Sequence, residues 1–121
     1  MLPNPMAPDA SETHWKITRS FARFAMEVPV SAMLSESASI PVASGKMRDI
    51  SLGGVGVVLD PPVGVGQRLW LEFRLPQGTS SLRILCKVRH YHGGRFGFQF
   101  LNITPEQREE IRQSCQGLAD V

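Results

Sequence analysis

The chain has 121 residues, of which 42% are hydrophobic and 20% are charged, as in an ordinary globular domain. Its 13 Lys and Arg against 11 Asp and Glu give a net charge of +2, too small to indicate bulk binding of nucleic acid. No apolar run reaches the roughly 18–20 residues of a membrane helix, and the N-terminus lacks the basic and apolar blocks of a secretory signal. We therefore expect a cytoplasmic protein without membrane insertion, with Cys86 and Cys115 as free, buried thiols.

The N-terminal residues divide into two expected segments. Residues 1–14 contain three prolines and show no periodicity, which predicts a flexible tail. Residues 15–23 follow as an arm in which basic and apolar residues are interleaved. Arg19 and Arg23 of this arm form an RxxxR pattern, whose plainest structural interpretation is a basic, partly docked segment anchored by an aromatic side chain.

Six strands are expected between residues 24 and 103, because apolar and polar residues alternate in short runs that turn residues separate. The expected strands are 24–34, 40–50, 55–59, 67–75, 82–90 and a last one in which Phe96, Phe98 and Phe100 point inward. Residues 35–39 are expected to form a loop, and the second strand is expected to break near Ser44-Gly45. Pro29, on the outer side of the first strand, predicts an edge position or a bulge.

A terminal helix is expected over residues 104–118. Thr104 is a good N-cap, Pro105 suits the first helical position, and Gln107 completes a capping box. Apolar residues then recur at i, i+4 and i+7, which predicts one stripe packed against the strands. They are Ile111, Cys115 and Leu118. The expected fold class is therefore all-β, a six-stranded antiparallel β-barrel with one C-terminal α-helix.

The sequence from Asp49 to Gly54 has the pattern DxSxxG. Because Asp49 and Ser51 are two positions apart, an extended strand places their side chains on one face, roughly 6–7 Å apart. Gly53 and Gly54 leave the backbone uncovered, so a bound group can approach it closely. A carboxylate, a hydroxyl and bare backbone, together with the two arginines of the RxxxR pattern, predict a site for one anionic nucleotide.

These motifs resemble those of the PilZ family, the bacterial receptor domains for cyclic di-GMP. The resemblance rests on the RxxxR and DxSxxG patterns in this order and on the run 94–100 before Thr104-Pro105, and it extends over about residues 16–118. It implies a PilZ domain over residues 15–121, with arm 15–23, barrel 24–103 and helix 104–118. The ligand-binding residues that it implies are Arg19, Arg23, Asp49, Ser51, Gly53 and Gly54.

One departure from the family pattern lies in the arm. Many members have a doubled arginine at the start of the first motif, whereas Ser20 follows Arg19 here and Thr18 precedes it. We expect this difference to change affinity or stoichiometry and to leave the identity of the ligand unchanged. Whether one nucleotide or a stacked pair binds is left open by the sequence.

The ligand's chemistry fits these residue types. Cyclic di-GMP has two phosphodiester charges and two guanines, and arginine binds both phosphate and the O6/N7 edge of guanine through paired N–H groups. Asp49 has two possible roles, accepting guanine N–H groups or holding an arginine in place. We expect the arm to fold over the barrel when the nucleotide binds, and a downstream protein partner to recognise the altered surface.

Three other interpretations of the sequence have less support. A PilZ-like adaptor would bind a protein partner and no nucleotide, and a small barrel binding single-stranded nucleic acid would use stacking platforms that are not expected on an outer face here. His90 and His92 share a strand face, but no third metal ligand lies at a useful spacing. Ser51 has no evident base beside it. We therefore expect no metal site, no cofactor, no nucleic-acid partner and no enzymatic activity.

Overall fold

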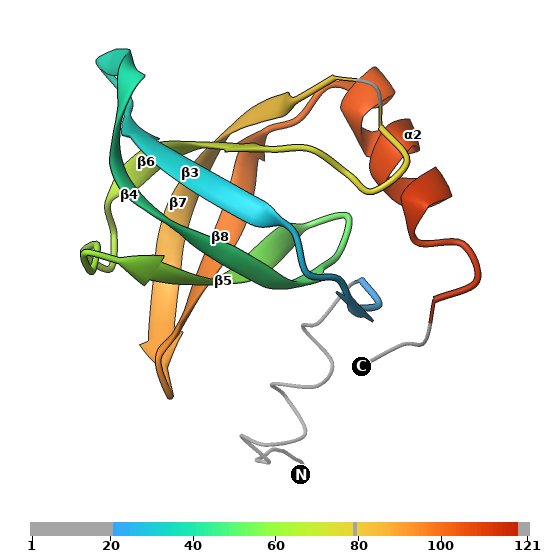
Figure 1. Ribbon diagram of the computed structural model, residues 1–121, viewed down its shortest axis with the longest axis horizontal. Coiled ribbons are helices and arrows are strands. Elements are labelled where there is room, and N and C mark those ends of the chain that lie inside the picture. Colours follow the sequence, from blue (N-terminus) through green and yellow to red (C-terminus); the bar gives the residue numbers. More distant parts are fainter. Residues whose placement is uncertain (1–20, 79, 119–121) are drawn as a thin grey trace, which may run out of the picture.

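The alternating segments form one antiparallel sheet in the computed structural model, which describes residues 21–78 and 80–118 (Figure 1). In chain order the elements are β2 (Phe24–Ala25), β3 (Pro29–Leu34), β4 (Ser37–Ile50), β5 (Gly54–Asp60), β6 (Arg68–Phe73), β7 (Leu82–His92), β8 (Arg95–Asn102) and α2 (Pro105–Ser114). The strand order is β2-β4-β3-β6-β7-β8-β5, and β4 also pairs with β5. That last pairing closes β3 to β8 into a six-stranded barrel, as expected, while the two-residue β2 lies along the end of β4.

The first expected strand is divided into β2 and β3, and Pro29 occupies neither of the alternatives predicted for it, an edge position or a bulge. β3 lies between β4 and β6 inside the sheet. Pro29 is its first residue and is paired with Lys46 of β4, whereas the pairing with β6 begins only at Val30. A proline is tolerated there because the first residue of a strand does not have to donate an N–H group to the ladder.

β4 is longer than the sequence indicates. It begins at Ser37, so the expected loop over 35–39 shrinks to a turn, and it continues through Ser44-Gly45 without the expected break. Gly45 is paired with Val30 of β3 on one side and with Leu59 of β5 on the other. Pairing on both edges overrides the weak strand preference of serine and glycine, and sequence periodicity does not record such pairing.

The barrel interior is filled by the apolar face of each strand. Phe96, Phe98 and Phe100 of β8 are buried as expected. Cys86 of β7 is completely buried and Cys115 is nearly so, and both thiols are free. Burial raises the pKa of both thiols, which keeps them protonated. The prediction of free, buried thiols is confirmed.

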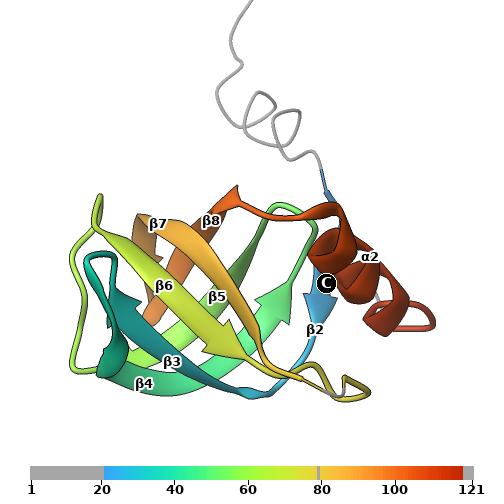
Figure 2. The same cartoon turned by 90° about the horizontal axis from the view of Figure 1, so that it is seen from above.

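Helix α2 lies at one end of the barrel, outside the strands (Figures 1 and 2). Its capping box forms as predicted: the Thr104 hydroxyl accepts from the Gln107 backbone N–H at 3.1 Å, and the Gln107 side chain accepts from the Thr104 N–H at 3.1 Å. Ile111 and Cys115 are buried, but Leu118 is 40% exposed and does not belong to the stripe. The helix ends at Ser114, and the positive φ of Gly117 turns the chain before Leu118 is reached.

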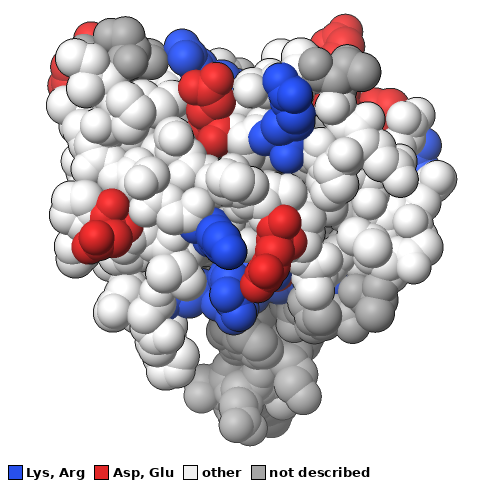
Figure 3. Space-filling view, viewed as in Figure 1, with Lys and Arg blue, Asp and Glu red and all other residues white. Residues whose placement is uncertain are grey.

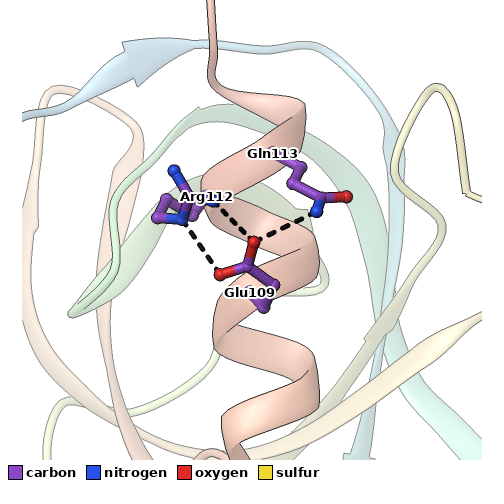
Figure 4. Close-up of polar contacts among 3 residues, drawn as sticks. All are labelled: Glu109, Arg112 and Gln113. Atoms are coloured by element: carbon purple, nitrogen blue, oxygen red, sulfur yellow. Dashed lines mark hydrogen bonds and ion pairs between the residues drawn. The ribbon is translucent and has the colours of Figure 1, made fainter.

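The exposed side of α2 has its own polar cluster (Figure 4). Arg112 donates through Nε and Nη2 to the two carboxylate oxygens of Glu109, at 3.0 and 2.6 Å, and the Gln113 amide donates at 3.0 Å. The hydrogen bond from Arg112 holds the pKa of Glu109 below its ordinary value.

No helix among the described residues is long and apolar enough to cross a membrane.

Candidate functional site

A pocket of about 640 Å³ lies where the turn between β4 and β5 meets the strands β7 and β8. Its lining includes five of the six residues that the motifs predict, namely Arg23, Asp49, Ser51, Gly53 and Gly54. The sixth, Arg19, lies outside the described residues, as do the tail and most of the arm. The fold therefore places Arg23 and the DxSxxG residues around one hollow, although Arg23 and Asp49 lie far apart in sequence.

Asp49 is the only buried charged residue in the described part of the chain, with 6% of its surface exposed. Its Oδ2 accepts from Nη1 of Arg95 on β8 at 2.9 Å. The carboxylate lies over its cross-strand neighbour Gly56, where a Cβ atom would come 2.7 Å from Oδ2 and 3.0 Å from Oδ1. A buried carboxylate needs a cationic partner such as Arg95, because an unpaired charge removed from water costs free energy.

A cross-strand row continues from Asp49 over four strands. Asp49 of β4 is paired with Gly56 of β5, Gly56 with Gly97 of β8, and Gly97 with His90 of β7. The His90 ring lies over Gly97 just as the carboxylate lies over Gly56, since a Cβ on Gly97 would meet the ring at 2.3 Å. The two central glycines thus form a floor, with an acid at one end and an imidazole at the other.

Ser51 organises the turn between β4 and β5. Its Oγ accepts from the backbone N–H groups of Gly53 and Gly54, both at 3.1 Å, and its own N–H donates to the Gly54 carbonyl at 2.8 Å. Gly54 has no room for a side chain, because a Cβ there would lie 2.0 Å from the Phe98 carbonyl oxygen of β8. The serine and the second glycine of the motif therefore have a structural role in seating β5 against β8.

Sequence patterns assigned no residue of the pocket's far wall to the ligand site, and His90 was considered only as one half of a metal pair. That wall comes from β7 and β8 and includes Arg89, His90, Arg95 and Gln99. Arg89 donates through Nη1 to the Gln99 side chain at 3.1 Å. Arg95 and Gln99 alternate with the inward phenylalanines of β8, so strand parity alone places them outside. The alternation along β8 does not show which of its outward residues faces Asp49.

Positive charge predominates around the pocket. Arg23, Arg89 and Arg95 bring three guanidinium groups to its lining, against the single carboxylate of Asp49. On the face drawn in Figure 3, Lys and Arg lie among Asp and Glu, in keeping with the small net charge of the chain. The expected absence of a histidine metal site stays a prediction, and no cluster of three metal-ligating side chains occurs within residues 21–78 and 80–118.

A closed antiparallel barrel with a C-terminal helix and a basic pocket at the β4–β5 turn defines the class, a small β-barrel domain with a basic surface pocket. The model of the PilZ domain family matches residues 17–117, and the chain belongs to this family. PilZ domains are receptor and adaptor domains that take cyclic di-GMP as a ligand and not as a cofactor. No curated protein sequence matches the chain significantly.

Solved structures show the same fold. The Bacillus subtilis inhibitor of motility, MotI/DgrA, is 22% identical with a TM-score of 0.66 over 81% of this chain and 49% of its own, so the present chain spans about half its length. The PilZ domain of YcgR from Escherichia coli, solved with c-di-GMP, is 18% identical with a TM-score of 0.61, covering 79% of this chain and 87% of that one. The PilZ domain of CeSA from a cellulose-synthesizing bacterium is 18% identical with a TM-score of 0.57, over 75% and 91% of the two chains.

Proposed function

We propose that this protein is a receptor for cyclic di-GMP, which it binds in the pocket between the β4–β5 turn and the strands β7 and β8. The observation that carries the proposal is the position of Arg23. It lines the same hollow as Asp49, Ser51, Gly53 and Gly54, so the described parts of both motifs lie around one site. The solved complex of the YcgR PilZ domain with c-di-GMP supports this ligand for the fold.

The charges of pocket and ligand are complementary. Cyclic di-GMP has two phosphodiester charges, and three guanidinium groups line the pocket against one carboxylate. Arg23 binds phosphate or guanine through its paired N–H groups, and Arg19 adds a second cation from the arm. Gly53 and Gly54 offer bare backbone to the ligand, while Ser51 holds their N–H groups in place.

The signal passes to a downstream protein. Binding of the nucleotide reorders the arm, residues 15–23, and the surface formed in this way is the one that the partner recognises. Ordering costs about 1–2 kcal/mol per backbone residue, so the charged hydrogen bonds of the arginines must exceed that cost. This role is that of a cytoplasmic signalling receptor without catalytic activity.

Calorimetric titration with cyclic di-GMP tests the proposal. Arg23→Ala removes charge-assisted hydrogen bonds of about 1.5–3 kcal/mol each, so affinity is expected to fall roughly tenfold to a few hundredfold. Arg68→Ala, which removes an exposed arginine on β6 away from the pocket, is the control and is expected to bind like the wild type. Equal affinity of the wild type and Arg23→Ala would refute the assignment of the site.

A second candidate function is a protein-binding adaptor that takes no nucleotide. One observation favours it: Asp49 and Ser51 already have partners within the protein, in Arg95 and in the backbone of Gly53 and Gly54. The DxSxxG motif therefore has a structural role that does not depend on a ligand. A wild-type titration without heat change, together with an unchanged melting temperature in the nucleotide, would favour the adaptor.

A further inference from the structure

We propose that Arg95 is a further ligand-binding residue, held by Asp49 so that its guanidinium group contacts the O6/N7 edge of one guanine. This inference rests on the proposed function and adds a residue outside both motifs. Arg95 lines the same pocket as Arg23 and is the partner of the buried Asp49. It lies 46 positions from Asp49 in the sequence.

The exposure of the two partners decides which of them meets the ligand. The Asp49 side chain is 8% exposed, whereas the Arg95 side chain is 48% exposed. An entering nucleotide therefore reaches the guanidinium group before the carboxylate. Of the two roles open to Asp49, the geometry favours the holding of an arginine, and that arginine is Arg95 of β8.

The geometry also restricts how Arg95 can move. Asp49 lies against Gly56 with its Oδ2 on Nη1 of Arg95, at 2.9 Å. A short carboxylate side chain packed against backbone has little room to follow a moving partner. Arg95 thus loses less conformational freedom on binding than an unpaired arginine would, and such pre-organisation favours affinity.

The choice of guanine over phosphate follows from the charge of the pair. Asp49 and Arg95 together are neutral, so a phosphate would gain little from Arg95 and would lie close to a carboxylate. The O6 and N7 atoms of guanine are neutral acceptors with the spacing of the arginine fork. The remaining guanidinium N–H groups of Arg95 suit that edge.

The first test compares cyclic di-GMP affinity in two matched variants. Arg95→Ala is expected to weaken binding roughly tenfold to a hundredfold, the effect of one bidentate arginine–guanine contact. Arg83→Ala is the control, because Arg83 is also a half-exposed arginine, 47% against 48%, in a cross-strand ion pair, with Glu72. It is expected to bind like the wild type. Equal affinities of Arg95→Ala and Arg83→Ala would overturn the inference.

The second test asks whether the contact is with the guanine edge. A 7-deazaguanine analogue of cyclic di-GMP lacks N7 and is expected to bind the wild type ~3- to 10-fold more weakly. In Arg95→Ala this penalty should shrink, because this contact is already lost. A penalty of undiminished size in Arg95→Ala, or one that is absent in the wild type, would overturn the guanine assignment.

Arg95→Lys guards against loss of the fold. Lysine keeps the positive charge beside Asp49 but lacks the planar fork, so Arg95→Lys should fold and bind more weakly than the wild type. Full affinity in Arg95→Lys would contradict the proposal. If the wild type itself does not bind cyclic di-GMP, the proposed function falls together with this inference, whereas wild-type binding with unaffected Arg95 variants removes the inference alone.

Discussion

The carboxylate of Asp49 lies over Gly56 so closely that a Cβ atom at position 56 would come within 2.7 Å of Oδ2. Gly56 stands two residues beyond the DxSxxG pattern, but it determines where the acid of that pattern can lie. The register that pairs β4 with β5 brings the two residues together. Gly56 therefore belongs to the structural unit that positions Asp49, although it lies outside the DxSxxG pattern.

Gly56→Ala is expected to displace the Asp49 carboxylate and weaken its ion pair with Arg95. Arg95 is then no longer held in place, so cyclic di-GMP affinity should fall toward the roughly tenfold to hundredfold loss expected for Arg95→Ala. Gly64→Ala serves as the control, because its Cβ would meet only the Gln67 Oε1 atom, at 3.8 Å. Calorimetry on both variants measures the difference, and equal affinities would show that the placement of Asp49 does not matter for binding.

Ser51→Ala is expected to destabilise the fold itself. The change leaves the N–H groups of Gly53 and Gly54 without their side-chain acceptor in a half-buried turn. The expected loss is about 1–2 kcal/mol in the free energy of unfolding without ligand, measured by chemical denaturation. Ser51→Thr keeps the hydroxyl and should recover most of that loss. Wild-type stability in Ser51→Ala would mean that the hydroxyl serves the ligand alone.

Thr104→Ala removes the N-cap of α2 and one half of its capping box. The expected cost is about 1 kcal/mol in unfolding free energy, with unchanged cyclic di-GMP affinity because the helix lies outside the pocket. Ser44→Ala, an exposed hydroxyl residue within β4, should change stability little. A loss of affinity in Thr104→Ala would connect the helix to the site and contradict this separation.

The cluster on α2 makes a pH-dependent contribution to stability. The pKa of Glu109 is lowered from 4.5 by its hydrogen bond to Arg112, so the folded state binds this proton less readily than the unfolded chain. The contribution is fully present above about pH 4.5 and is lost as the pH falls through the lower folded value. Denaturation of the wild type and Glu109→Gln across this range should show a stability difference that shrinks on acidification. A difference independent of pH would contradict the ionic origin.

Local pattern was enough for much of the architecture. The alternating runs identified the barrel strands, and Thr104 with Gln107 identified the start of the helix, because both features depend on neighbours a few residues apart. The prediction of a strand break near Gly45 was wrong because pairing with strands on both sides overrides local preference. The prediction that Leu118 is buried in the helix stripe was wrong because the chain turns before it. Pro29 was misplaced because edge or inner position depends on the partners of β3.

The candidate site divides in the same way. The spacing of Asp49, Ser51 and the glycines is local, so the pocket wall formed by the β4–β5 turn can be recognised as a motif in the sequence. The opposite wall is not, because Arg95 faces Asp49 only through the registers that join β8 to β5 and β5 to β4. Such a pairing spans 46 residues and leaves no periodic trace. The sequence by itself thus identifies Asp49 and its position on a strand. Only closure of the barrel determines that its partner is Arg95, because this closure brings β8 close to β4.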